Sequence, residues 1–259
     1  MSSASTIPAE FRREKLKVNG VDVIMLTAGS GEPLLFFHGA GTWHGFDFAL
    51  PWASRFQVMI PYHPGWGESA DAPEMTTPDD YALHYLELID QLKLDKVNLV
   101  GISMGGRFAA TFTIHHRRRV RKLVLICPAG LVVPGSPHIS KLPPEDIPKY
   151  LVNDFSVIAR HVPQSPSAEF QAAREREGAS FGRMMQAGLV GPWLDRWLHR
   201  VNVPTLIVWG DKDRLVPPEH AQAWAKLIPG SKVLMVPGAG HLVPDEKPES
   251  VEEIAKFLA

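Results

Sequence analysis

The chain has 259 residues, of which 45% are hydrophobic and 21% are charged, so it can bury a globular core and is not disordered throughout. A formal net charge of -1 gives no electrostatic basis for a nucleic-acid partner or another strongly anionic one. The single cysteine, Cys127, excludes an intramolecular disulfide, and no apolar run approaches the roughly 18 residues of a membrane span.

The amino-terminal part of the chain is predicted to form short strands. Apolar or β-branched runs at residues 16–18 and 21–26 are joined by Asn19-Gly20, a dipeptide typical of a two-residue hairpin because both residues accept positive φ. Two further runs, at 34–37 and 58–60, are bounded by glycine or proline. The sequence therefore predicts a leading antiparallel pair followed by further strands.

Helices then alternate with buried strands. The segment Thr77-Pro78-Asp79-Asp80 supplies an N-cap hydroxyl, a proline at the first helical position and acids in the first turn, which predicts a helix to about Leu92. The largely apolar run Val97-Asn98-Leu99-Val100 and the apolar run at 123–126 predict buried strands on either side of a helix over 104–115. This alternation predicts a mostly parallel sheet flanked by helices.

A proline-rich insertion interrupts the alternation after Cys127. Seven of the 23 prolines lie between positions 134 and 166, and a helix is predicted over roughly 168–185. The alternation resumes with the elements predicted at 205–209, 218–228 and 233–236 and from Glu249 onward. We therefore predict a discontinuous core over residues 1–129 and 200–259 and a helical cap over residues 130–199.

The segment Gly101-Ile102-Ser103-Met104-Gly105 lies between a predicted strand and a predicted helix, the context that a nucleophilic serine on a sharp turn requires. Such a serine needs a histidine base and an orienting acid, in the order Ser, acid, His. His241, in the loop after the last predicted strand, is the candidate base. Asp211 and Asp213 both follow the predicted strand at 205–209, and their spacing leaves both possible as the acid.

An oxyanion hole requires two converging backbone N–H groups. His38-Gly39-Ala40-Gly41 follows an early strand and is small enough to approach a substrate, so we expect the amides of Ala40 and Met104 to be the donors. The expected substrate-binding residues are Trp43, Met184, Trp193 and Leu242. A phosphate-binding glycine pattern and a metal-binding histidine spacing are both absent from the sequence, so we expect neither a cofactor nor a metal.

Several segments, taken in chain order, resemble the landmarks of the α/β-hydrolase superfamily: His38-Gly39, Pro64-Gly65-Trp66-Gly67-Glu68-Ser69, Gly101-Ile102-Ser103-Met104-Gly105-Gly106, Trp209-Gly210-Asp211-Lys212-Asp213 and Gly240-His241. The resemblance implies the α/β-hydrolase fold, of class α/β, in its serine-nucleophile branch with a helical cap. Ser103 and His241 match their motif positions directly. In the family the acid usually stands three residues after the glycine, which assigns that role to Asp213.

The chain departs from the family pattern in places that bear on substrate. Tyr62 and His63 stand where many members have an aspartate, so we expect a different contact to support this turn. Members that cleave carbon–carbon bonds commonly have a polar residue in place of Ile102 and an aromatic one in place of Leu242. Ser103 argues against dehalogenases and most epoxide hydrolases of this fold, which use an aspartate nucleophile.

We therefore expect a serine hydrolase that cleaves a small to medium, largely apolar ester through an acyl-enzyme. A carbon–carbon bond or lactone hydrolase of the same fold and a non-catalytic ligand-binding receptor are the alternatives. The expected partner is a small-molecule substrate, with neither nucleic acid nor membrane, and the short polar segment at residues 1–10 favours a cytoplasmic location. The sequence makes no prediction of oligomeric state.

Overall fold

An eight-stranded sheet forms the centre of the computed structural model, which describes residues 10–136, 147–159, 161, 163–191 and 193–259. Its strands lie in the order β1-β2-β4-β3-β5-β6-β7-β8. They are β1 (Arg12–Val18), β2 (Val21–Ala28), β3 (Glu32–Phe37), β4 (Phe56–Pro61), β5 (Val97–Ile102), β6 (Val120–Ile126), β7 (Thr205–Gly210) and β8 (Lys232–Val236). Pairs β1/β2 and β2/β4 are antiparallel and the other neighbouring pairs are parallel, which confirms the predicted mostly parallel sheet.

The leading hairpin turns where the sequence predicts. Val18 pairs with Val21, so Asn19 and Gly20 form a two-residue turn. Their φ angles are 46° and 84°, both in the left-handed region that asparagine and glycine accept most readily.

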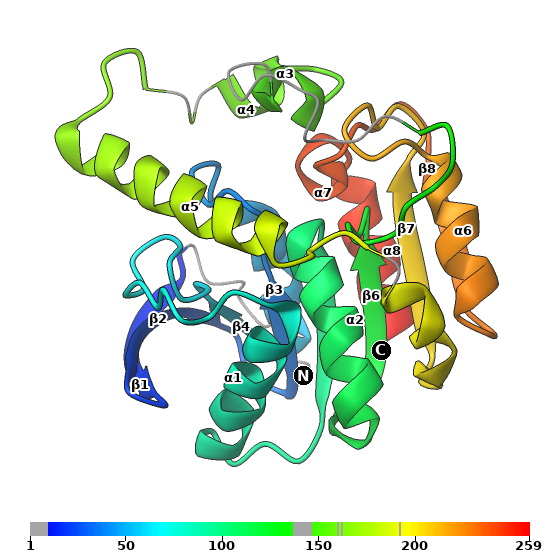
Figure 1. Cartoon of the computed structure of the whole chain (residues 1–259), viewed down its shortest axis with the longest axis horizontal. Helices are drawn as coiled ribbons and strands as arrows, with labels where there is room; N and C mark the ends of the chain where they lie inside the picture. The colour runs from blue at the N-terminus through cyan, green and yellow to red at the C-terminus, as the bar shows by residue number, and fades with distance from the viewer. Residues whose placement is uncertain (1–9, 137–146, 160, 162, 192) are drawn as a thin grey trace, which may run out of the picture.

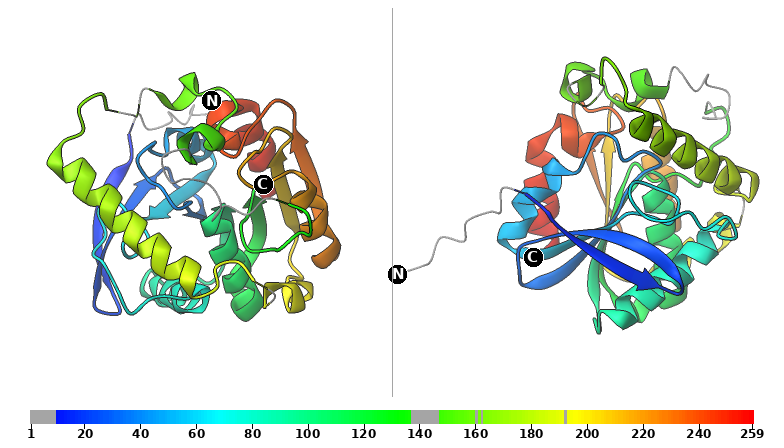
Figure 2. Two further views of the ribbon diagram at one scale, coloured as in Figure 1. Left: turned by 45° about the horizontal axis from the view of Figure 1, so that its top comes forward. Right: turned by 90° about the vertical axis from the view of Figure 1, so that its left-hand side faces the viewer.

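Helices cover both faces of the sheet. They are α1 (Pro78–Gln91), α2 (Met104–His116), α3 (Ile147–Leu151), α4 (Ser156–Ala159), α5 (Ala168–Gln186), α6 (Glu219–Leu227), α7 (Val243–Glu246) and α8 (Pro248–Leu258). Figure 2 shows α1 and α2 on one face and α8 on the other. Among the described residues, no helix combines the length and the apolar character that a membrane crossing requires.

Helix α1 begins as its sequence predicts. The Thr77 hydroxyl accepts a hydrogen bond from the Asp80 amide at 3.2 Å, and the Asp80 carboxylate accepts one from the Thr77 amide at 2.8 Å. This reciprocal capping satisfies two amides that the helix itself leaves without partners.

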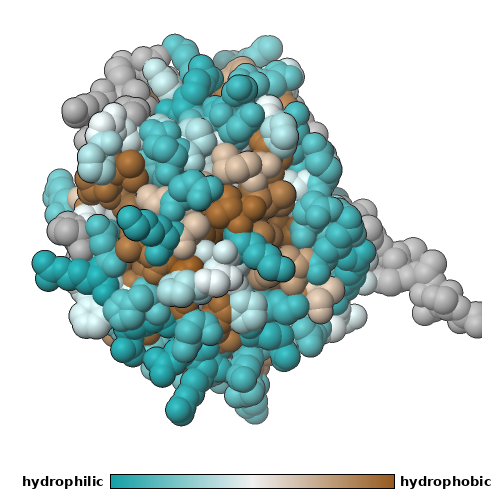
Figure 3. All heavy atoms as spheres, turned by 90° about the vertical axis from the view of Figure 1, so that its right-hand side faces the viewer, coloured by the Kyte–Doolittle hydropathy of each residue, from teal (hydrophilic) through white to brown (hydrophobic). Residues whose placement is uncertain are grey.

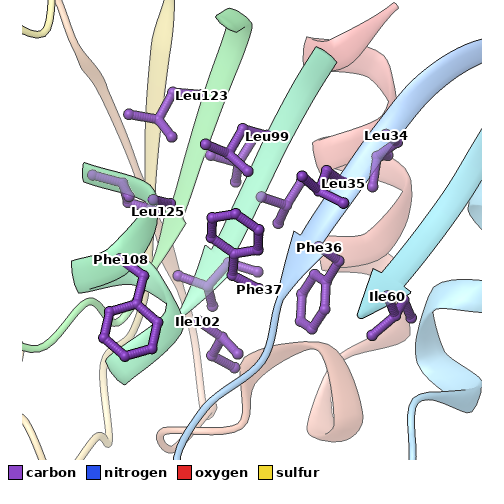
Figure 4. Packing of buried hydrophobic residues seen from close by; sticks show 14 of the residues in the cluster. Leu34, Leu35, Phe36, Phe37, Ile60, Leu99, Ile102, Phe108, Leu123 and Leu125 are labelled. Carbon is purple, nitrogen blue, oxygen red and sulfur yellow. The ribbon is translucent and has the colours of Figure 1, made fainter. Parts of the chain in front are cut away.

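The hydrophobic core lies on both sides of the central strands. Every residue of β5 is buried, and Figure 4 shows Leu99 and Ile102 of this strand packed beside Phe37 of β3 and Leu125 of β6. Strands buried on both faces read as continuous apolar runs, which is why these segments were predictable. Apolar residues also remain visible among polar ones on the face drawn in Figure 3, as on most folded proteins.

The segment inserted between β6 and β7 contains α3, α4 and α5. Figure 1 shows these helices beyond the ends toward which β6 and β7 point. The observed bounds of α5 agree with the helix predicted over 168–185, and the Ser167 hydroxyl caps it by accepting from the Phe170 amide at 3.2 Å. Residues 137–146, 160, 162 and 192 of the predicted cap lie outside the described residues. The division into core and cap stays a prediction.

Candidate active site

Ser103 occupies the sharp turn between β5 and α2. Its φ of 54° and ψ of -119° are strained for a residue other than glycine, and its amide donates to the Ile126 carbonyl at 2.9 Å. The turn lies close to the end of β3, since a β-carbon at Gly105 would be only 2.1 Å from the Phe37 carbonyl oxygen. This crowding accounts for the glycine and holds the serine at the carboxyl edge of the sheet.

His241 and Asp213 form a buried pair that joins the loops after β8 and β7. The Nδ1 atom of His241 lies 2.7 Å from Oδ2 of Asp213, and both side chains are at least 98% buried. The other carboxylate oxygen, Oδ1, accepts from the amides of Leu215 and Val216 at 2.9 Å each. Because a carboxylate accepts, Nδ1 carries the proton and leaves the lone pair of the neutral ring on Nε2.

Asp211, the other candidate acid, serves a different contact. Its Oδ1 accepts a hydrogen bond from the Gly238 amide at 2.7 Å, and its side chain is exposed. The structure therefore brings Asp213, and not Asp211, to His241.

A cavity of about 690 Å³ contains the exposed parts of Ser103 and His241 in its wall. Nε2 of His241 is buried and has no hydrogen-bond partner among the described residues, so it is not yet bonded to the serine hydroxyl. Hydrogen bonds of this kind often tighten only when substrate is bound. The cavity thus brings together a hydroxyl and an oriented base.

The two expected oxyanion donors also line this cavity. Met104 is the first residue of α2, so its amide has no partner within the helix. Ala40 lies in the loop after β3, and the neighbouring Gly39 is close enough to the serine that an added β-carbon would be 3.5 Å from Cβ of Ser103. Both backbone segments therefore approach the serine.

Two buried histidines support the loop after β3. The Nε2 atom of His38 accepts from the amide of His63 at 3.0 Å, so its Nδ1 carries the proton and donates to the Gly39 carbonyl at 2.7 Å. The ring of His63 donates through Nε2 to the His38 carbonyl at 2.9 Å and meets the Tyr85 hydroxyl at Nδ1. Burial lowers the pKa of His38 to about 3 and that of His63 well below its usual range, so both rings are neutral.

These contacts also answer the expectation raised by the missing aspartate. The turn that contains His63 is held by its imidazole and by Ser69, whose hydroxyl donates to the Tyr62 carbonyl at 2.8 Å and accepts from the Ile24 amide at 3.0 Å. Uncharged side chains, and not a carboxylate, therefore make the hydrogen bonds that hold the backbone of this turn.

The four residues expected to bind substrate divide into two groups. Trp43 and Leu242 line the cavity. Met184 is instead fully buried in the core, and the next residue, Met185, faces the cavity. Trp193 lies on the surface, where it stacks on His115 and covers the guanidinium of Arg107. Neither Met184 nor Trp193 is therefore among the residues that line this cavity, because the side chain of Met184 faces the core and Trp193 lies past the end of α5.

The sequence reasoning missed two charged residues of the cavity, Arg174 and Glu177 of α5. The Glu177 side chain is only 2% exposed and accepts hydrogen bonds from the Thr42 hydroxyl at 2.5 Å, the Gly67 amide at 3.1 Å and the Arg174 guanidinium. Their spacing of three residues is a signal for an ion pair on a helix. Which way that pair faces depends on how α5 packs, and the sequence pattern leaves this open.

Cys127 lies beside Asp213 and His241. One potential donor atom from each of Cys127, Asp213 and His241 lies within 4.8 Å of the other two. Burial, and secondarily the Asp213 carboxylate, raise the pKa of the thiol well above its usual range. The thiol is therefore protonated at neutral pH and is a poor nucleophile.

A model of the alpha/beta hydrolase family matches residues 34–254. The chain therefore belongs to the alpha/beta hydrolase family, in agreement with its fold and with the resemblance seen in its motifs.

Relatives of this chain have differing activities. It is 29% identical to a 2-hydroxy-6-oxo-6-(2'-aminophenyl)hexa-2,4-dienoic acid hydrolase of Metapseudomonas resinovorans, over 90% of this chain and 86% of the other. It is 30% identical to a poly(3-hydroxyalkanoate) depolymerase of Ectopseudomonas oleovorans, over 87% and 84% of the two chains. A solved structure of a thermophilic esterase from Thermogutta terrifontis is also similar, with a TM-score of 0.76, 25% identity and coverage of 95% and 98%.

Proposed function

We propose that this protein is a serine esterase that forms an acyl-enzyme with Ser103. The observation that carries the proposal is the strained turn at Ser103 in the wall of the same cavity as the buried His241–Asp213 pair. A hydroxyl is a weak nucleophile at neutral pH, so an oriented base beside it is the feature that hydrolysis requires.

The reaction begins when substrate places its carbonyl carbon against Ser103. Nε2 of His241 takes the hydroxyl proton while Oγ bonds to the carbonyl carbon. The electron pair of the C=O bond moves to oxygen, where the amides of Ala40 and Met104 donate to it. Each such donor stabilises the transition state by about 3 kcal/mol in comparable sites.

The tetrahedral intermediate collapses when the C–O bond to the alcohol breaks. The imidazolium of His241 gives its proton to the departing oxygen, which leaves an ester on Ser103. Water then gives a proton to His241 and attacks that ester, and the same steps release the acid. Asp213 accepts from Nδ1 throughout and stabilises the imidazolium.

The lining of the cavity supports a small or medium, largely apolar ester. Most of the lining residues are aliphatic or aromatic, among them Phe46, Phe48, Leu131, Phe181, Met185, Leu189 and Val190. Such a wall favours an apolar acyl or alkyl group through the burial of its surface.

A fluorophosphonate probe tests the serine mechanism because it phosphonylates an activated serine. The wild type is expected to be labelled, and Ser103→Ala with unchanged circular dichroism is expected to be unlabelled. Absence of labelling in the folded wild type would contradict the mechanism and favour the ligand-binding receptor.

Carbon–carbon bond hydrolysis is the second candidate, because the cavity holds the cation Arg174 and two relatives carry dienoate or dienoic acid hydrolase names. A guanidinium can bind the carboxylate of an acidic substrate. Turnover of p-nitrophenyl esters and of a vinylogous diketone acid should be compared on one preparation. A higher kcat/KM for the diketone acid would overturn the ester assignment.

A further inference from the structure

His220, the second residue of α6, lines the cavity that contains Ser103. Its side chain belongs to a residue that is only 5% exposed, and the proposed reaction gives it no role. Leu215 and Val216, in the loop before α6, also line the cavity and are aliphatic. His220 is thus the polar side chain in an apolar part of the wall.

Two contacts fix the orientation of the His220 ring. Its Nδ1 lies 3.0 Å from the Pro217 carbonyl oxygen, and its plane is nearly parallel to that of Trp209, at 12°, with the ring centroids 6.3 Å apart. The indole of Trp209 is fully buried and donates from Nε1 to the Val216 carbonyl at 2.9 Å. A closely packed part of the core therefore positions the histidine.

The same contacts determine which ring nitrogen can accept a hydrogen bond. A carbonyl oxygen only accepts, so Nδ1 carries the proton and donates to Pro217, and the lone pair of the neutral ring is on Nε2. No described residue donates to Nε2, and this atom is not among the polar atoms that are buried without a partner. Nε2 therefore presents an acceptor to the open space of the cavity.

His220 and Arg174 lie on opposite sides of Ser103. Ser103 follows β5 and His220 follows β7, whereas the Arg174 guanidinium lies against the loop after β3, where a β-carbon at Gly41 would be 3.4 Å from it. In the sheet, β3 and β7 are separated by β5 and β6, a span of about 14 Å. A substrate with its carbonyl at Ser103 therefore extends toward a cation on one side and toward a neutral acceptor on the other.

The acceptor distinguishes a hydroxyl group from an alkyl group. An alkyl chain against Nε2 displaces water and leaves the nitrogen without a donor, whereas a hydroxyl donates to it. A few fixed polar groups in an apolar wall are what give a small-molecule site its selectivity.

We propose that His220 is a specificity-determining residue that accepts a hydrogen bond from a hydroxyl group of the substrate. The ester then carries this hydroxyl on the chain that extends toward β7. The inference rests on the proposed function, because it assigns part of the substrate of that same site.

Binding to Ser103→Ala, which lacks the nucleophile, tests this hydrogen bond separately from turnover. The probes are two pairs of esters in which a terminal hydroxyl replaces a methyl group. Methyl 6-hydroxyhexanoate and methyl heptanoate test the acyl side, and 4-hydroxybutyl butyrate and pentyl butyrate test the alcohol side. In one pair, adding His220→Phe is expected to lower the preference for the hydroxy ester, measured as a ratio of Kd values, by at least about fivefold.

Two further variants control this measurement. His220→Gln, whose amide oxygen can accept, should recover part of the preference. His199→Phe makes the same change at an exposed histidine that is not among the residues lining the cavity, and it is expected to leave both ratios unchanged.

A second measurement needs no substitution at His220. The nitrogen NMR signal of its Nε2 in Ser103→Ala is expected to shift further with the hydroxy ester of the selected pair than with the alkyl ester. Ratios that His220→Phe leaves unchanged in both pairs, equal shifts with both esters, or failure of both hydroxy esters to bind would each overturn the proposal. A preference that depends on His220, in a protein whose wild type hydrolyses none of the four esters, would support this site and contradict the esterase function instead.

Discussion

The imidazole of His38 donates a hydrogen bond to the carbonyl oxygen of Gly39, its own neighbour in the chain. The Gly39 carbonyl and the Ala40 amide belong to one planar peptide group and point in opposite directions. His38 therefore fixes the direction of the Ala40 N–H without touching a substrate.

His38→Leu is accordingly expected to lower kcat by about tenfold or more with little change in KM, because a misdirected donor stabilises the oxyanion less. His38→Asn, whose side-chain amide can donate in place of Nδ1, should recover part of the loss. Steady-state kinetics with one ester, on variants of matched thermal stability, measures the split. A rise in KM with unchanged kcat would contradict the role.

Substitution of Asp213 and of Asp211 distinguishes the carboxylate that orients His241 from one that only holds a loop. Asp213→Asn retains an oxygen that can accept from Leu215 and Val216 but loses the charge beside His241, so we expect kcat to fall by about 10⁴-fold. Asp211→Asn affects only the bond to Gly238 and is expected to keep activity within a few-fold. The assignment fails if the second variant is the inactive one.

Substitution of Arg174 tests whether the cavity favours substrates with a negative charge. Arg174→Met is expected to lower kcat/KM for the anionic ester mono-p-nitrophenyl glutarate by about tenfold, because it removes a charge-assisted hydrogen-bond donor from the cavity. Neutral p-nitrophenyl butyrate should change by no more than about twofold.

Arg176→Met is the matched control, since this arginine lies on the same helix but bonds the Gly67 carbonyl and is not among the residues that line the cavity. Equal losses for both esters in Arg174→Met would show that the arginine acts by holding α5 and Glu177 in place instead.

Buried neutral histidines make the fold sensitive to acid. Burial lowers the pKa of His38 to about 3 and of His84 to about 4, and lowers that of His63 well below its usual range. Their unfolded pKa is about 6.5, so below that pH the unfolded chain binds protons that the folded chain does not. The free energy of unfolding should therefore fall as pH drops from 6.5, by up to about 1.4 kcal/mol per pH unit for each group.

Urea denaturation between pH 7.5 and 5 measures this slope in a range above most carboxyl titration. His84→Leu removes one of the three groups and should flatten it. A wild-type free energy of unfolding that stays constant over this range would contradict the prediction.

The fold and the positions of the candidate residues Ser103 and His241 could be predicted because their local signals are short and strong. Each of these signals is compatible with a single local structure. They are the buried runs of β5 and β6, the turn at Asn19-Gly20 and the glycines around Ser103. The choice between Asp211 and Asp213 was different, because either side chain fits the loop spacing. The family resemblance indicated Asp213, and the three-dimensional path of the loop after β8 brings His241 to it.

For the segment inserted between β6 and β7, the sequence predicts that a helix is present but not which way its faces point. The bounds of α5 follow from its propensity and its N-cap, but the direction of its faces depends on contacts with distant loops. The sequence does not distinguish Met185, which lines the cavity, from Met184, which faces the core. It also gives no signal that Arg174 and Glu177 face inward. The part of the cavity wall that comes from α5 is therefore the part that a single sequence predicts least well.

Glu177 also limits how this protein can be re-engineered. By sequence it belongs to the inserted segment, yet its carboxylate bonds Thr42 in the loop after β3 and Gly67 in the turn after β4. A chimera that exchanges residues 130–199 for those of another family member would cut both bonds and loosen the loop that carries Ala40. We expect a chimera to be active only when the new segment supplies a carboxylate in the place of Glu177. Exchange of this segment should therefore change the reaction rate together with the substrate range.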